Sequence, residues 1–254
     1  MMKLTLLKSL CLMLVGTAFT THAAVNLDRT RIVFPESDKA SSLKIENQSK
    51  ALPYLALSWI EDEKGRKEDS HFMALPPIQR IEAGSASQVR IVKQAATSQL
   101  PKDRESLFYC NLREVPPKST SASDERSVMQ VAMQSRIKLF WRPKAITKKP
   151  GEQAEMRMEI SATAKGLTIH NPTPYYITLA WLSKNARTML PGFDSLMLAP
   201  FATATTSTGD YHGNYYSIGY IDDYGALKKV DVQCAGTAQC SLTERKIEKD
   251  AQSR

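Results

Sequence analysis

The most regular pattern of hydrophobic and polar positions runs from Ser127 to Pro143, where apolar and polar residues alternate. From Met129 to Trp141 the odd-numbered positions are apolar apart from Ser135, and the even-numbered positions are mostly polar. A period of two is typical of a β-strand with one buried face. Strands commonly have about 5–6 residues, so this alternation predicts an unusually long strand over 127–142.

The two halves of this predicted strand differ in composition. The second half is rich in Ile, Leu, Phe and Trp, whereas the first half contains Met129, Val131 and Met133 and follows a polar run. Methionine is a flexible side chain that is common on surfaces adapting to several partners. Two interpretations therefore remain open. The segment is one long core strand, or its first half offers apolar side chains to another protein by β-strand addition.

Short apolar or alternating runs, separated by turn residues, continue along the rest of the chain. They predict about seven strands before Pro143, which indicates an immunoglobulin-like β-sandwich. A second β-rich region follows a short basic linker that begins at Lys144. The fold class is therefore all-β. The expected strands are 25–34, 41–46, 53–60, 72–75, 87–93, 107–115, 127–142, 156–163, 167–170, 175–182, 195–199, 216–221 and 227–234.

The N-terminus has the pattern of a secretory signal peptide. Lys3 and Lys8 flank an apolar run at 10–19 that is too short to span a membrane, and a small-x-Ala cleavage site ends at Ala23. Cleavage after Ala24 is the alternative. The predicted organisation is a signal peptide at 1–23, one domain at 24–143 and a second domain at 144–254. The charged tail from about 244 is expected to be disordered.

Charge and cysteine content narrow the classes of function. Loss of two signal-peptide lysines lowers the net charge from +8 to +6, and the remaining basic residues are scattered among acidic ones. This indicates a solvated surface rather than nucleic-acid binding. Export permits disulfides, and Cys234 and Cys240 flank a short turn, so we expect them to pair. Cys110, within an aromatic run, is expected to be a buried free thiol.

The sequence contains no recognisable catalytic or metal-binding constellation. His71, His170 and His212 lie far apart without metal-ligand spacing. Motifs for a nucleophilic serine, a zinc protease and a phosphate loop are absent from the chain. The pair Asp222-Asp223 precedes Tyr-Gly, which is typical of a turn between strands. We therefore expect a protein without catalytic residues, cofactor or metal.

The run Leu100 to Pro116, LPKDRESLFYCNLREVP, resembles the signature of periplasmic pilus-assembly chaperones of the PapD type. Four further matching segments are IKLFWRP at 137–143, NLDRTR at 26–31, NPTPYY at 171–176 and DYG at 223–225. The resemblance covers essentially the whole mature chain. It implies two immunoglobulin-like domains in a boomerang arrangement with a cleft between them. The segment 116–127 lacks a bracketing cysteine pair, which resembles the short-loop subgroup.

The resemblance also implies a mechanism and its residues. In donor-strand complementation, a long chaperone strand fills the groove of a pilus subunit that lacks its last strand. By resemblance, Met129, Val131 and Met133 fill that groove. Arg31 and Lys138 are implied to anchor the C-terminal carboxylate of the subunit, where two cations would form charge-assisted hydrogen bonds. A third implied set, Glu105, Arg142 and Asp223, forms a salt-bridge network between the domains.

The expected function is that of a periplasmic chaperone that delivers pilus subunits or adhesins to an outer-membrane usher. One alternative is an exported structural or adhesive fimbrial component, but the segment 24–28 is short for the donor extension that a pilin carries. The other alternative is a periplasmic enzyme with an unrecognised site. Self-association of the free chaperone through its exposed strand is also open, because unpaired strand edges invite it.

Overall fold

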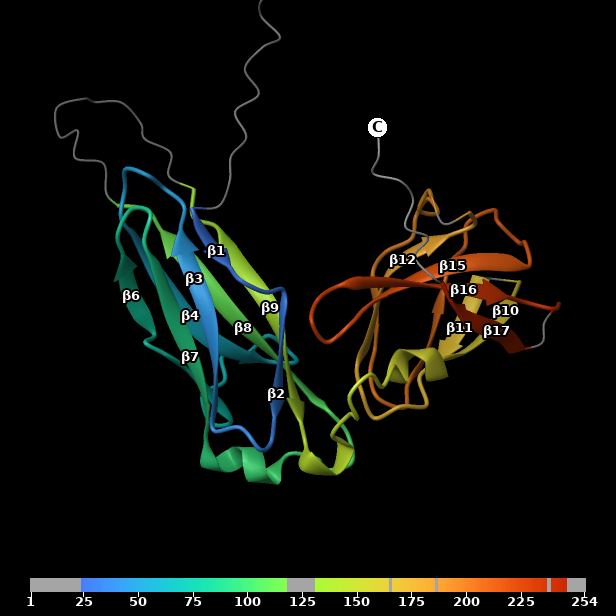
Figure 1. Cartoon of the computed structure of the whole chain (residues 1–254), viewed down its shortest axis with the longest axis horizontal. Helices are drawn as coiled ribbons and strands as arrows, with labels where there is room; N and C mark the ends of the chain where they lie inside the picture. Colours follow the sequence, from blue (N-terminus) through green and yellow to red (C-terminus); the bar gives the residue numbers. More distant parts are fainter. Residues whose placement is uncertain (1–23, 118–130, 165, 186, 237–238, 246–254) are drawn as a thin grey trace, which may run out of the picture.

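The computed structural model describes residues 24–117, 131–164, 166–185, 187–236 and 239–245. The predicted signal peptide, Met129 and the end of the tail lie outside these residues. The described chain folds into two β-domains that join where β9 runs into the linker and diverge away from that junction (Figure 1). Each domain has its own apolar core. The prediction of an all-β chain with two domains is therefore confirmed.

The N-terminal domain consists of two sheets that face each other across one core. The strands are β1 (Val25–Leu27), β2 (Arg31–Pro35), β3 (Ala40–Asn47), β4 (Tyr54–Asp62), β5 (Phe72–Leu75), β6 (Ile78–Ile81), β7 (Ala86–Lys93), β8 (Ser106–Val115) and β9 (Gln134–Arg142). One sheet has the order β1-β3-β7-β5 and the other has the order β2-β9-β8-β4-β6. Phe34, Phe72 and Trp141 meet between them, with ring centroids 5.3–5.8 Å apart.

The C-terminal domain is a single hydrogen-bonded sheet of eight described strands. These are β10 (Glu159–Thr163), β11 (Gly166–His170), β12 (Ile177–Ser183), β13 (Leu196–Leu198), β14 (Thr203–Thr206), β15 (Tyr215–Ile221), β16 (Leu227–Gln233) and β17 (Gln239–Glu244). β17 pairs with both β16 and β10 and thereby connects the two halves of the sheet. The apolar faces of the two halves of the sheet share one core. Three short 3-10 turns complete the described elements: η2 (Ala95–Gln99), η3 (Lys144–Ile146) and η4 (Ala154–Arg157).

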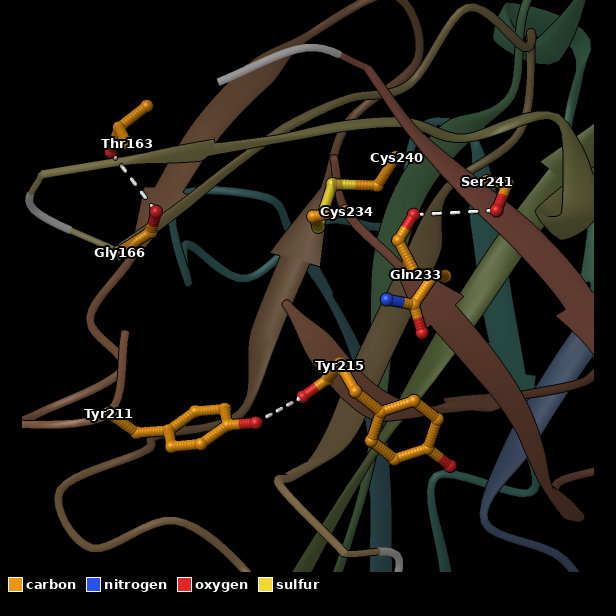
Figure 2. Close-up of a disulfide and its surroundings, with 8 residues drawn as sticks. All are labelled: Thr163, Gly166, Tyr211, Tyr215, Gln233, Cys234, Cys240 and Ser241. Carbon is orange, nitrogen blue, oxygen red and sulfur yellow. Dashed lines mark hydrogen bonds between the residues drawn. A yellow bond between two sulfur atoms is a disulfide. The ribbon is translucent and has the colours of Figure 1, made fainter. Parts of the chain in front are cut away.

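The expected disulfide between Cys234 and Cys240 is present, with an S–S distance of 2.04 Å. It lies where β16 ends and β17 begins (Figure 2). The Ser241 hydroxyl, next to the bridge, donates to the Gln233 carbonyl at 3.4 Å. Cys110 is free and buried, and burial raises the pKa of its thiol to about 12. A thiol held in its protonated form is a poor nucleophile, so Cys110 acts as a core residue.

Three predicted strands differ clearly from the observed ones, and β6, β14 and β17 were not predicted. The expected strand 156–163 begins only at Glu159, because residues 154–157 form the 3-10 turn η4. The expected strand 25–34 is split, because β1 pairs with β3 in one sheet whereas β2 pairs in parallel with β9 in the other. The expected strand 127–142 is shorter in the described residues, since β9 begins at Gln134 and residues 131–133 lie outside any strand. One ladder bond continues beyond it, from the Glu114 amide to the Met133 carbonyl at 3.0 Å.

Candidate functional site

The first half of β9 has a strand on one side only. β8 pairs with β9 from Gln134 to Trp141. β2 begins at Arg31, opposite Lys138, and pairs only with the second half of β9. No described strand pairs with the remaining edge of residues 134–137. Backbone N–H and C=O groups along such an edge are available to a strand from another chain.

The two described apolar residues of the predicted groove-binding set lie just before this edge. Val131 is 61% exposed and Met133 is 49% exposed. In sequence they continue the alternation of Ile137, Leu139 and Trp141, whose side chains are buried in the core. The core does not extend far enough to cover Val131 and Met133. Two large apolar side chains are therefore left in solvent next to an unpaired strand edge.

Arg31 and Lys138 lie side by side at the point where the unpaired edge ends. They are opposite residues of the parallel β2–β9 pair. The Arg31 guanidinium is largely buried, and its Nη1 donates to the Ile221 carbonyl of the second domain at 3.1 Å. The Lys138 ammonium donates to the Thr178 hydroxyl at 3.1 Å. The two cations therefore lie between the domains and contact both.

The electrostatics of this pair are unfavourable in the free protein. Burial lowers the pKa of Arg31, although the charges of Asp223 and Asp222 partly oppose the shift. Burial, and then the charge of Arg31, lowers the pKa of Lys138. Neither side chain forms an ion pair with a carboxylate in the described parts of the chain. The Arg31 Nε is buried and has no hydrogen-bond partner there. Such a pair is suited to bind an anion.

Glu105, Arg142 and Asp223 form a contiguous network at the junction of the domains. Arg142 donates to Glu105 Oε1 from Nε at 2.8 Å and makes two bonds to the Asp223 carboxylate, at 2.7 and 3.0 Å. The second oxygen of Glu105 accepts from the Tyr176 amide at 2.8 Å. Arg142 and Glu105 come from the first domain, whereas Asp223 and Tyr176 come from the second. The network therefore joins the two domains directly.

Sequence reasoning missed three further members of this network. Lys148 of the linker donates to Asp223 Oδ1 at 3.2 Å and to Glu155 Oε1 at 2.9 Å. Tyr175 lies beneath both cations, with its ring centre 5.1 Å from Arg142 and 4.7 Å from Lys148. Lys148 stands in a basic run and Glu155 in a short 3-10 turn, so no local pattern distinguishes them from ordinary surface charges.

The network predicts that the unfolding free energy depends on pH through the carboxylate of Asp223. Burial alone raises the pKa of Asp223, but Arg142 and Lys148 outweigh it and hold the pKa below the ordinary value of 3.8. The charged carboxylate therefore stabilises the fold above pH 3.8, and this stability is lost as the pH falls through the lower folded pKa.

We expect Asp223→Asn to lower the unfolding free energy at pH 7 by about 1–3 kcal/mol, because a bidentate ion pair to a buried arginine is lost. The deficit should shrink as the pH falls below 3.8. Urea unfolding from pH 7 to pH 3 measures it, with exposed Asp69→Asn as the matched control. A deficit of constant size across this range would contradict the role given to Asp223.

The geometry of this site defines a class of protein. Two immunoglobulin-like domains present an unpaired strand edge, exposed apolar side chains beside it and a cationic pair at its end. These are features of a protein that binds an extended strand of another protein. Among the residues that the structure describes, no helix is long and apolar enough to cross a membrane.

Comparisons with known proteins identify the family. Residues 24–147 match the pili and flagellar-assembly chaperone PapD N-terminal domain, and residues 153–231 match the pili assembly chaperone PapD C-terminal domain. The fimbrial chaperone YbgP of Escherichia coli K12 is 53% identical, covering 96% of this chain and 100% of YbgP. The chaperone protein PapD of Escherichia coli is 43% identical, over 88% of this chain and 92% of PapD.

Solved structures agree with these matches. The periplasmic chaperone SfaE is 32% identical and superposes with a TM-score of 0.67, covering 84% of this chain and 100% of SfaE. The Salmonella enterica SafB chaperone, solved in complex with the SafA pilin, gives 25% identity and a TM-score of 0.69, covering 89% of this chain and 98% of the matched chain.

The chain belongs to the PapD family of pilus-assembly chaperones. The resemblance inferred from its motifs is thereby confirmed, and so is the two-domain immunoglobulin-like fold. Members of this family are binding proteins rather than enzymes, which agrees with the prediction that the chain has no catalytic site. The matched relatives named above are chaperones, and nothing among them favours a structural fimbrial component.

Proposed function

We propose that this protein is a periplasmic chaperone for pilus subunits and passes them to an outer-membrane usher. A subunit adds its exposed strand to the unpaired edge of β9, and its C-terminal carboxylate binds between Arg31 and Lys138. Val131 and Met133, together with Met129 of the preceding segment, enter the apolar groove of the subunit. The two-domain frame at 24–143 and 144–254 holds this surface.

The observation that carries the proposal is the position of the cationic pair at the end of the free edge. β2 occupies the β9 edge from Lys138 onward, so an added strand must end where Arg31 begins. A strand whose C-terminal carboxylate reaches Arg31 and Lys138 must therefore run in the same direction as β9. The anchor sets both the direction and the register of the client strand, while main-chain hydrogen bonds leave its sequence free.

The energetics agree with this division of roles. Burying a large apolar side chain contributes about 1.5–3 kcal/mol before ordering costs are subtracted. A carboxylate that pairs with two partly desolvated cations adds charge-assisted hydrogen bonds. The relatives support the client class, since SafB was solved in complex with a pilin. No nucleotide is required, because binding energy alone stabilises the complex.

We expect Met133→Glu to weaken the binding of a purified pilus subunit at least about tenfold, because a charge would enter an apolar groove. Surface-captured chaperone titrated with subunit measures the change. Met189→Glu is the matched control, since Met189 is exposed to a similar degree but lies in the second domain. Equal affinities for the two variants would exclude Met133 from the binding surface. An absence of subunit binding by the wild-type protein would contradict the proposed function itself.

A further inference from the structure

The first half of β9 is extended although little of the fold holds it there. It has no strand on one side, and among its residues only Ile137 is buried in the core. The second half, by contrast, pairs with β2 and buries Leu139 and Trp141. A strand with one neighbour and few core contacts is expected to open locally at low cost in free energy. Some other interaction must keep residues 134–137 in place.

Polar contacts on the outer face of the sheet provide that interaction. Arg136 Nε donates to Glu61 Oε2 at 2.9 Å, and the Arg136 guanidinium stacks 3.4 Å from the centre of the Tyr109 ring. The other oxygen of Glu61 accepts from the Trp59 indole at 2.9 Å. Arg136 is thus tied to two neighbouring strands, to β8 through Tyr109 and to β4 through Glu61.

Gln134, two residues before Arg136 on the same face of β9, is held in a similar way. Its side-chain Oε1 accepts from the Arg113 guanidinium at 2.7 and 3.0 Å, and its side-chain Nε2 donates to Asn111 Oδ1 at 3.0 Å. Arg113 in turn lies over the Trp59 ring at 5.3 Å. Asn111 is fully buried, whereas Gln134 and Arg113 are exposed, so only the contact with Asn111 is partly shielded from solvent. Both outward side chains of the half-strand are therefore fixed to β8 and, through Trp59 and Glu61, to β4.

We propose that these contacts form a brace that holds the unpaired edge of β9 flat and extended in the free chaperone, and that Glu61 and Arg136 are its principal positioning residues. The inference rests on the proposed function, because it explains how the edge is ready for a client strand. A preorganised edge avoids the entropy cost of ordering at the moment of binding. The brace occupies the outer face only, which leaves the backbone edge and the apolar side chains open.

The brace predicts a local effect that is separate from global stability. Single partly exposed ion pairs contribute little to the unfolding free energy, so Glu61→Ala and Arg136→Ala should unfold close to wild type in urea. Hydrogen exchange of a peptide covering 131–137 should accelerate roughly three- to tenfold in both variants. Association with a pilus subunit should slow by a similar factor, while dissociation changes less.

The double variant Glu61→Ala/Arg136→Ala separates the brace from two independent surface effects. If the two residues act together, it exchanges no faster than either single variant. Arg80→Ala is the matched control, because Arg80 lies on β6, the opposite edge of the same sheet, and pairs with Glu82 at 2.8 Å. It should leave exchange at 131–137 unchanged.

Unchanged exchange in both single variants would overturn the brace. So would additive acceleration in the double variant, since independent contacts do not form a brace. Exchange is measured on the free protein, so this result does not depend on whether subunits bind. If exchange accelerates as expected but no subunit binds the wild type, the brace stands and the proposed function fails.

Discussion

Lys138→Ala is expected to weaken the binding of a pilus subunit at least about 30-fold, the largest effect of any single change on the proposed client site. Loss of one partner from a buried, hydrogen-bonded charge pair typically costs about 2–5 kcal/mol. The fold should tolerate the change, because burial and the neighbouring Arg31 already penalise the charged lysine. Titration of purified subunit against captured chaperone measures the affinity, and urea unfolding checks the fold.

A second change tests whether the lost interaction is with a carboxylate. A subunit extended by two residues at its C-terminus moves its carboxylate away from the cationic pair. It should bind the wild type weakly, and Lys138→Ala should cause little further loss. Exposed Lys144→Ala serves as the control for a general loss of positive charge. If Lys138→Ala binds the extended subunit a further 30-fold more weakly than the wild type does, the lysine acts on some other part of the client.

Arg142→Ala is expected to destabilise the protein by about 3–5 kcal/mol, the largest effect on stability. Its removal leaves the Glu105 carboxylate, which is 3% exposed, with only the Tyr176 amide as a described partner. A buried charge without its counter-ion accounts for a penalty of this size. Burial already raises the pKa of Glu105 against the opposing charge of Arg142. The urea midpoint and slope, compared with wild type, give the change.

Two companion variants identify the cause of this loss. Arg142→Lys keeps the charge but cannot make two parallel bonds to Asp223, so an intermediate loss is expected. Glu105→Gln combined with Arg142→Met removes both charges, and should recover part of the stability lost in Arg142→Ala. If the unfolding free energy of Arg142→Ala lies within about 1 kcal/mol of the wild-type value, the network contributes little to holding the domains together.

Much of the N-terminal domain was predictable because its strands alternate cleanly. β9 places Ile137, Leu139 and Trp141 in the core and Lys138 between the domains, as its pattern implies. The disulfide was predictable because only a short turn separates its cysteines. The split of the first expected strand was not predicted, although the sequence carries a sign of it. The apolar positions shift from odd numbers (Val25, Leu27) to even numbers (Ile32, Phe34) across a polar stretch, and the two pieces pair in different sheets.

The charged residues of the candidate site were predictable only where they fall in the family's motifs, whereas the alternation alone already singled out Val131 and Met133. Arg31, Lys138, Glu105, Arg142 and Asp223 were all selected through that resemblance. Lys148 and Glu155 join the same network but carry no local signal, since their partners are distant in sequence. The brace was missed for a related reason. The outward residues of β4, β8 and β9 look like ordinary surface positions until strand pairing brings them together.

Hydrogen exchange of the chaperone with and without a bound pilus subunit tests the central claim most directly. One edge of the five-stranded sheet is formed by β2 and, before β2 begins, by the first half of β9, and the other edge is β6. The proposal assigns the client strand to the first half of β9 alone. Binding should protect amides in a peptide covering 131–137 and leave those of Ile78–Ile81 unchanged. Protection at β6 with none at 131–137 would contradict strand addition at the unpaired edge of β9.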